Sequence, residues 1–174
     1  MGNTQTNLWS QENLTPILTS NNDHYKKHNS IYYLQYVKNN IIIDTIDNQN
    51  FYRYDWKYID NFDDYIKLFS YSDYNKLYND IVYQNIMWGY VYTIKSDKNN
   101  LKIIDVIKNE KLVKYLYPAN IQLITNFNIM IEQISHRLRE LFPDIDGLKI
   151  RDNIYILFNR KDIKIIEIKE VVIS

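Results

Sequence analysis

The side chains best suited to chemistry in this chain are aromatic rings, and they concentrate in residues 51–94. Two of the three tryptophans, Trp56 and Trp88, lie there among a dense run of tyrosines. An exposed aromatic ring can stack on a flat ligand such as a nucleic-acid base. Aromatic rings are also the largest core residues, so packing against other side chains is the alternative explanation. The sequence leaves both explanations open.

Motifs for catalysis are missing from the sequence. The chain contains no cysteine, which excludes disulfides, thiol catalysis and thiolate metal sites. The three glycines, Gly2, Gly89 and Gly147, are isolated, which excludes a glycine-rich phosphate loop. Glu132 and His136 stand one helical turn apart, but an exposed pair on a helix surface explains this spacing better than acid–base chemistry. We therefore expect a protein that is not an enzyme and that uses no cofactor or metal.

The length of 174 residues suits one domain, which we expect at residues 30–174 after a flexible polar arm at residues 1–29. Lys plus Arg and Asp plus Glu balance at 21 each, so no global field draws the protein to nucleic acid or to an anionic membrane. No apolar run approaches the roughly 18 to 20 residues that a membrane span needs. The sequence therefore predicts no transmembrane segment.

The abundance of isoleucine, asparagine and lysine is typical of an A/T-rich genome, such as that of a large DNA virus or a protist. Near the N-terminus, Gly2 and Thr6 stand at the spacing of an N-myristoylation signal. One myristoyl chain alone gives only marginal membrane binding. We therefore expect a cytoplasmic protein, in the host cytoplasm if it is viral, with weak membrane association through Gly2.

Hydrophobic patterning predicts the elements that must position these residues. Apolar residues recur at steps of three and four up to Leu141, which predicts one long helix at about 120–142 that Pro143 closes. Residues 74–82 favour neither helix nor strand. Short helices are expected at 62–71 and 109–116. Strands are expected at 31–38, 41–46, 51–59, 87–95 and 101–107, followed by a terminal hairpin of 153–158 and 163–172.

The predicted fold class is therefore α+β. We expect a curved, mainly antiparallel sheet, with the long helix and the shorter helices packed on one of its faces.

The order of these elements resembles a known family. An aromatic strand at 51–59 is followed by Phe69, then by Met87 and Trp88, then by the long helix and a strand pair bearing Arg151. Over residues 31–158 this order is similar to the mRNA cap-binding translation initiation factor 4E family. The resemblance implies an eight-stranded curved sheet backed by helices. It also implies capped mRNA, or a 7-methylguanine nucleotide, as the ligand.

The resemblance assigns roles to particular residues. Tyr52 and Trp88 match the two rings that stack on the cationic 7-methylguanine, which gains a cation–π term from that stacking. Arg151 matches by position one of the basic residues with which the family holds the cap phosphates on the late strand pair, and Arg160 and Lys161 are nearby candidates for the same role.

On the opposite surface, Phe69 corresponds to the helix residue that docks an amphipathic helix of a scaffold protein, with Tyr65 beside it. The chain departs from the family at Gly89, where the family has the glutamate that binds the guanine edge.

A second function stays open beside cap binding. It is a non-enzymatic structural or interaction protein, such as a virion component that carries a myristoyl group on Gly2. Cap binding requires Tyr52 and Trp88 to face one cleft, and this alternative does not.

Overall fold

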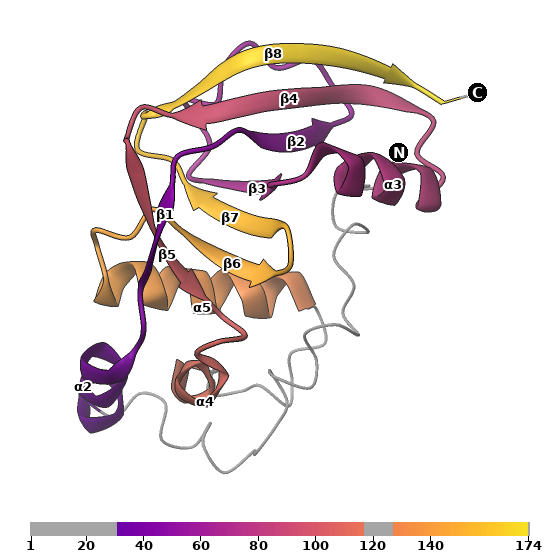
Figure 1. Cartoon of the computed structure of the whole chain (residues 1–174). Coiled ribbons are helices and arrows are strands. Elements are labelled where there is room, and N and C mark those ends of the chain that lie inside the picture. The colour runs from indigo at the N-terminus through magenta and orange to yellow at the C-terminus, as the bar shows by residue number, and fades with distance from the viewer. Residues whose placement is uncertain (1–30, 117–126, 174) are drawn as a thin grey trace.

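The computed structural model describes residues 31–116 and 127–173 of the chain, and these form an α+β fold around one open sheet (Figure 1). The sheet has eight strands in the order β1-β5-β6-β7-β3-β2-β4-β8. Strands β5 and β6 run parallel, and the other six neighbouring pairs are antiparallel. The predicted fold class and the mainly antiparallel sheet are therefore confirmed.

The strands are β1 (Asp44–Asp47), β2 (Phe51–Asp55), β3 (Lys67–Tyr71), β4 (Trp88–Ser96), β5 (Asn100–Asp105), β6 (Gly147–Arg151), β7 (Ile154–Phe158) and β8 (Ile163–Val172). The helices are α2 (Ile31–Asn40), α3 (Tyr74–Tyr83), α4 (Glu110–Val113) with the 3-10 turn η3 (Lys114–Leu116), and α5 (Phe127–Leu141). In Figure 1, β8, β4 and β2 lie crosswise to β1 and β5, so the sheet is strongly twisted.

Two hydrophobic clusters cover the two faces of the sheet. All the described helices contribute to one cluster, which includes Val37 of α2, Leu77 of α3, Val113 of α4 and Leu138 of α5. We call this side the helical face, and Figure 1 shows the helices gathered there. The other cluster is rich in aromatic residues, and we call its side the aromatic face. Its buried members are Phe51, Phe62, Leu68, Tyr92, Ile94, Leu101, Ile103, Tyr155 and Leu157.

The long helix expected at about 120–142 is not borne out. Helix α5 has 15 residues, which corresponds to about 22 Å at 1.5 Å per residue. It ends at Leu141, two residues before Pro143, which cannot continue a helix. Residues 120–126 of the expected helix lie outside the described residues. None of the described helices is long and apolar enough to cross a membrane.

Two further element predictions are wrong. Residues 31–38 were expected as a strand but belong to α2, where Leu34 and Val37 pack at helical spacing against the core, followed by Ile41 just after the helix. Residues 62–71 were expected as a helix, but their second half is β3. That strand is central in the sheet, and its pairing with β2 and β7 overrides the local pattern. Both faces of β3 are covered, with Leu68 on one and Phe69 on the other.

The terminal hairpin is also wrong, because β7 and β8 are not neighbours in the sheet. Strand β7 pairs with β3 and β6, whereas β8 pairs with β4 at the edge. The connection between them is fixed by side chains: Asn159 donates to the carbonyl oxygens of Phe62 and Tyr65, and Ser96 donates to Asp162. The connection held by these contacts passes β3, β2 and β4 before β8 joins the edge of the sheet.

Gly89 allows β4 to pass close to β2. Its φ angle is +156°, and a Cβ atom at this position would overlap the ring of Tyr54 on the helical face. The Tyr54 hydroxyl donates a hydrogen bond of 2.6 Å to the carbonyl oxygen of Trp88. Tyr54 therefore holds the backbone that carries Trp88, and it fits there only because residue 89 has no side chain.

We predict that Gly89→Ala destabilises the protein by about 1–3 kcal/mol, because the new methyl group overpacks against Tyr54. Urea unfolding followed by far-UV circular dichroism measures the change. The control is Lys95→Ala, an exposed position on the same strand, which should change stability by less than about 0.5 kcal/mol. Equal stability of wild type and Gly89→Ala would contradict this account of the close approach.

Candidate binding surface

Three exposed or half-buried rings form a continuous group on the aromatic face. Trp88 and Tyr90 stand two residues apart on β4, so both project to the same side, and their ring centroids lie 5.5 Å apart. Tyr58 follows β2 and lies 5.6 Å from Tyr90, also edge to face. Trp88 is 44% exposed and Tyr58 is 57% exposed. We call Tyr58, Trp88 and Tyr90 the aromatic patch.

A buried tyrosine fixes the backbone that presents Tyr58. Residues 56–66, the covering segment, fold over the aromatic face, where Phe62 packs edge to face on Tyr92 at 5.3 Å. The Tyr92 hydroxyl accepts a hydrogen bond of 2.6 Å from the Ile59 amide and donates one of 2.9 Å to the Lys57 carbonyl. These two bonds flank Tyr58 on both sides. Burial raises the pKa of Tyr92 to about 12.

A buried arginine supports the same segment from below. Arg53 is 5% exposed, and its guanidinium lies 5.3 Å from the ring centroid of Tyr65 and 5.7 Å from that of Phe62. Its Nη2 is 3.6 Å from Oδ2 of Asp55, which is also buried. Desolvation lowers the pKa of Arg53, and the charge of Asp55 opposes that shift. The covering segment thus packs two of its own rings, Phe62 and Tyr65, against the desolvated guanidinium of Arg53, whose charge is paired with Asp55.

The structure does not bring Tyr52 and Trp88 together. Tyr52 pairs with Thr93 across β2 and β4, and its ring packs on Tyr74 of α3 on the helical face. Trp88 alternates with Gly89 and lies on the aromatic face with Tyr90. The two rings therefore project from opposite faces of the sheet and cannot enclose one base in this arrangement.

The three cations expected to bind phosphate are not assembled either. Arg151 ends β6, whereas Arg160 and Lys161 follow β7, so a five-residue strand of about 17 Å separates them. The Arg160 guanidinium donates hydrogen bonds to the carbonyl oxygens of Pro143 and Ile145, which gives it a structural role. Arg151 and the other two cations lie at opposite ends of β7.

The partner-docking pair is separated in the same way. Phe69 is half-buried in the cluster of the helical face, and Tyr65 packs with Phe62 on the aromatic face. Tyr65 precedes β3 and belongs to the segment that folds over the aromatic face, whereas Phe69 lies within β3, so the two rings do not share one helix surface. Gly2 lies outside the described residues.

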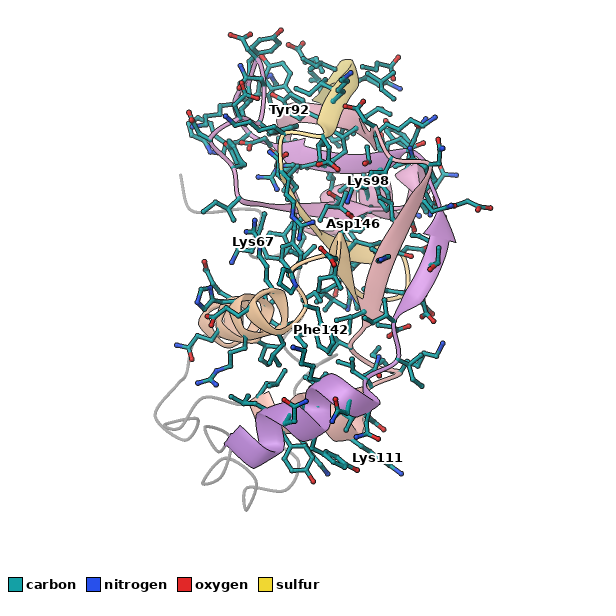
Figure 2. The ribbon with its side chains drawn as sticks, turned by 90° about the vertical axis from the view of Figure 1, so that its left-hand side faces the viewer. Lys67, Tyr92, Lys98, Lys111, Phe142 and Asp146 are labelled. Carbon is teal, nitrogen blue, oxygen red and sulfur yellow. The ribbon has the colours of Figure 1, made fainter. Side chains whose placement is uncertain are left out.

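A cleft of about 410 Å³ lies between α5 and the start of β3. Its polar groups are already engaged in part: Glu132 forms an ion pair of 2.8 Å with Lys67, and His136 lies 2.5 Å from Glu140. Figure 2 shows Lys67 above α5. Glu132 and His136 therefore have different partners and do not act on each other. Within residues 31–116 and 127–173, no group of three or more acidic or histidine side chains could hold a metal ion.

Sequence reasoning overlooked Tyr58, Tyr90 and Tyr92 as a functional unit. The available signal was the spacing of two between Trp88, Tyr90 and Tyr92, which places all three on one side of a strand. What the sequence could not supply is the register of β2 against β4 and the return of the covering segment onto Tyr92.

Comparison with known proteins adds no relative to this description. No protein-family model matches the chain, no curated protein matches it, and no solved structure matches it.

We predict that stability declines with rising pH between about 10 and 12, and that Tyr92→Phe lessens this decline. Tyr92 ionises near its ordinary pKa of about 10 in the unfolded chain, but only at about 12 in the folded protein. Its contribution to stability is therefore complete below pH 10 and is lost as the pH rises through 12. The free energy of unfolding in urea, measured from pH 8 to 12, gives the profile.

Tyr83→Phe, at an 81% exposed position, is the matched control and should keep the profile of the wild type. An identical decline in the wild type and in Tyr92→Phe would show that the Tyr92 hydroxyl is not buried as described.

Proposed function

We propose that the protein is a non-enzymatic interaction protein that binds a protein partner through the aromatic patch. The observation that carries the proposal is the exposure of Trp88 and Tyr58, whose backbones are held by the buried hydroxyls of Tyr54 and Tyr92 respectively. Tryptophan and tyrosine are enriched among the few residues that dominate binding energy at protein interfaces. Because the three rings already contact one another, a partner would order few new side-chain rotations.

The charges beside the patch favour a protein over a polyanion. Tyr90 has Asp55 opposite it on β2 and Glu170 opposite it on β8, so both cross-strand neighbours are acidic. Asp55 is buried and paired with Arg53, but the exposed carboxylate of Glu170 repels phosphate groups, and the basic residues expected to bind phosphate lie elsewhere. A partner that supplies apolar side chains, such as the apolar stripe of an amphipathic helix, fits this surface better.

Binding of the mRNA cap, with a role in translation initiation, is the second candidate. It is favoured by one observation, namely that Trp88 keeps a 44% exposed indole on the face that also carries Glu170. The 7-methylguanine base is cationic, so it would gain both a cation–π term and an attraction to the carboxylate. In this version of the proposal the 7-methylguanine base stacks on Trp88 alone, because Tyr52 lies on the other face of the sheet.

We predict that a photo-crosslinking residue placed at Tyr58 forms one discrete adduct in an extract of the cells in which the protein occurs. The adduct should be lost in Trp88→Ala, because that change removes the largest exposed ring of the patch. The control places the same crosslinker at Tyr83, which is 81% exposed but lies on α3. Gel electrophoresis and mass spectrometry measure the adducts.

Equal labelling at positions 58 and 83, or an adduct that survives Trp88→Ala, would contradict the proposal. The extract is also supplied with 7-methyl-GTP or with GTP as a competitor. Loss of the adduct with the methylated nucleotide alone would assign the patch to the cap instead.

A further inference from the structure

The outer edge of β8 is open. Strand β8 has ten residues, pairs with β4 on one side, and is last in the strand order, so no described strand covers its other side. An uncovered edge presents unpaired backbone N–H and C=O groups to other chains. Ile166, at the irregularity in the β4–β8 register, is also 55% exposed. The edge is therefore long enough and apolar enough to accept another strand.

The charges of β8 are complementary to those of a second β8 in one register. If two copies pair antiparallel about a twofold axis at Ile168, Glu167 of each copy lies opposite Lys169 of the other. An axis at Lys169 would place Lys169 against its own copy, and an axis at Glu167 would place Glu167 against its own copy while setting Lys164 opposite Glu170. Among these axes, only the one at Ile168 brings opposite charges together without placing like charges opposite each other.

The side chains of this register also share a face. Glu167 and Lys169 pair with Thr93 and Val91 of β4, which alternate to the helical face. The Lys169 ammonium lies 5.2 Å from the ring centroid of Tyr74, which holds it near the strand. An opposite-charge pair across two strands stabilises their pairing. The twofold symmetry supplies two such pairs.

We propose that the protein forms a homodimer in which β8 pairs antiparallel with β8 of a second copy about Ile168, joining the two sheets into one. This pairing uses the strand edge and leaves the aromatic patch on the face of the sheet, so it does not depend on the proposed function. A twofold contact of this kind is closed and does not propagate into a fibre.

Charge reversal tests the register directly by sedimentation velocity of the purified full-length protein at low salt. The wild type should be dimeric, and Glu167→Lys and Lys169→Glu alone should each weaken the dimer about tenfold or more, because like charges then face each other. An equimolar mixture of the two variants should recover a dimer, since each Lys then meets a Glu. Lys111→Glu, on α4 at the far end of the molecule (Figure 2), should not affect dimerisation.

Far-UV circular dichroism shows whether each variant is folded. A monomeric wild type at about 100 μM, well above the micromolar range of ordinary specific contacts, would overturn the proposal. So would a mixture of folded variants that stays monomeric. The double variant Glu167→Lys/Lys169→Glu offers a second check, because it should dimerise like the wild type.

Discussion

The place of Tyr58 in the aromatic patch depends on the hydroxyl group of Tyr92. This residue has no exposed surface, and its hydroxyl is both acceptor and donor for the backbone on either side of Tyr58. A buried hydroxyl without partners costs about 1–3 kcal/mol, so the covering segment is tied to the position where this group is satisfied. Arg53 beneath the segment adds a second constraint, because its desolvated charge is compensated by Asp55 and by aromatic rings.

The alternation of side chains along β2 and β4 then decides which residues can act together. Tyr52 and Trp88 were matched by sequence order, but they project from opposite faces of the sheet. Tyr90 takes the place of Tyr52 as the neighbour of Trp88, and the chain returns through the covering segment to add Tyr58. A function that needs two rings around one base is therefore disfavoured, and one that needs a broad aromatic surface is favoured.

Sequence patterns predicted the elements whose apolar spacing is regular. The strands at β4 and β5, the short helix near α4 and the end of α5 before Pro143 lie close to their expected positions. The failures have a common cause, because α2 and β3 owe their form to tertiary contacts. Residues 31–38 are rich in β-branched and aromatic residues yet pack at helical spacing through Val37, and β3 is held by strands on both sides. Of the expected site, only Trp88 lies on the patch, since strand register cannot be derived from local pattern.

The central claim is that the Tyr92 hydroxyl fixes the covering segment and with it the place of Tyr58 in the aromatic patch. Amide hydrogen exchange of the wild type and of Tyr92→Phe tests it most directly, with residues 74–83 of α3 as an internal reference. We predict slow exchange of the Ile59 amide in the wild type, and exchange at least about tenfold faster in Tyr92→Phe, which corresponds to roughly 1.4 kcal/mol of local stability. Exchange in α3 should stay unchanged. Rapid exchange of Ile59 in the wild type, or equal exchange in both proteins, would contradict the claim.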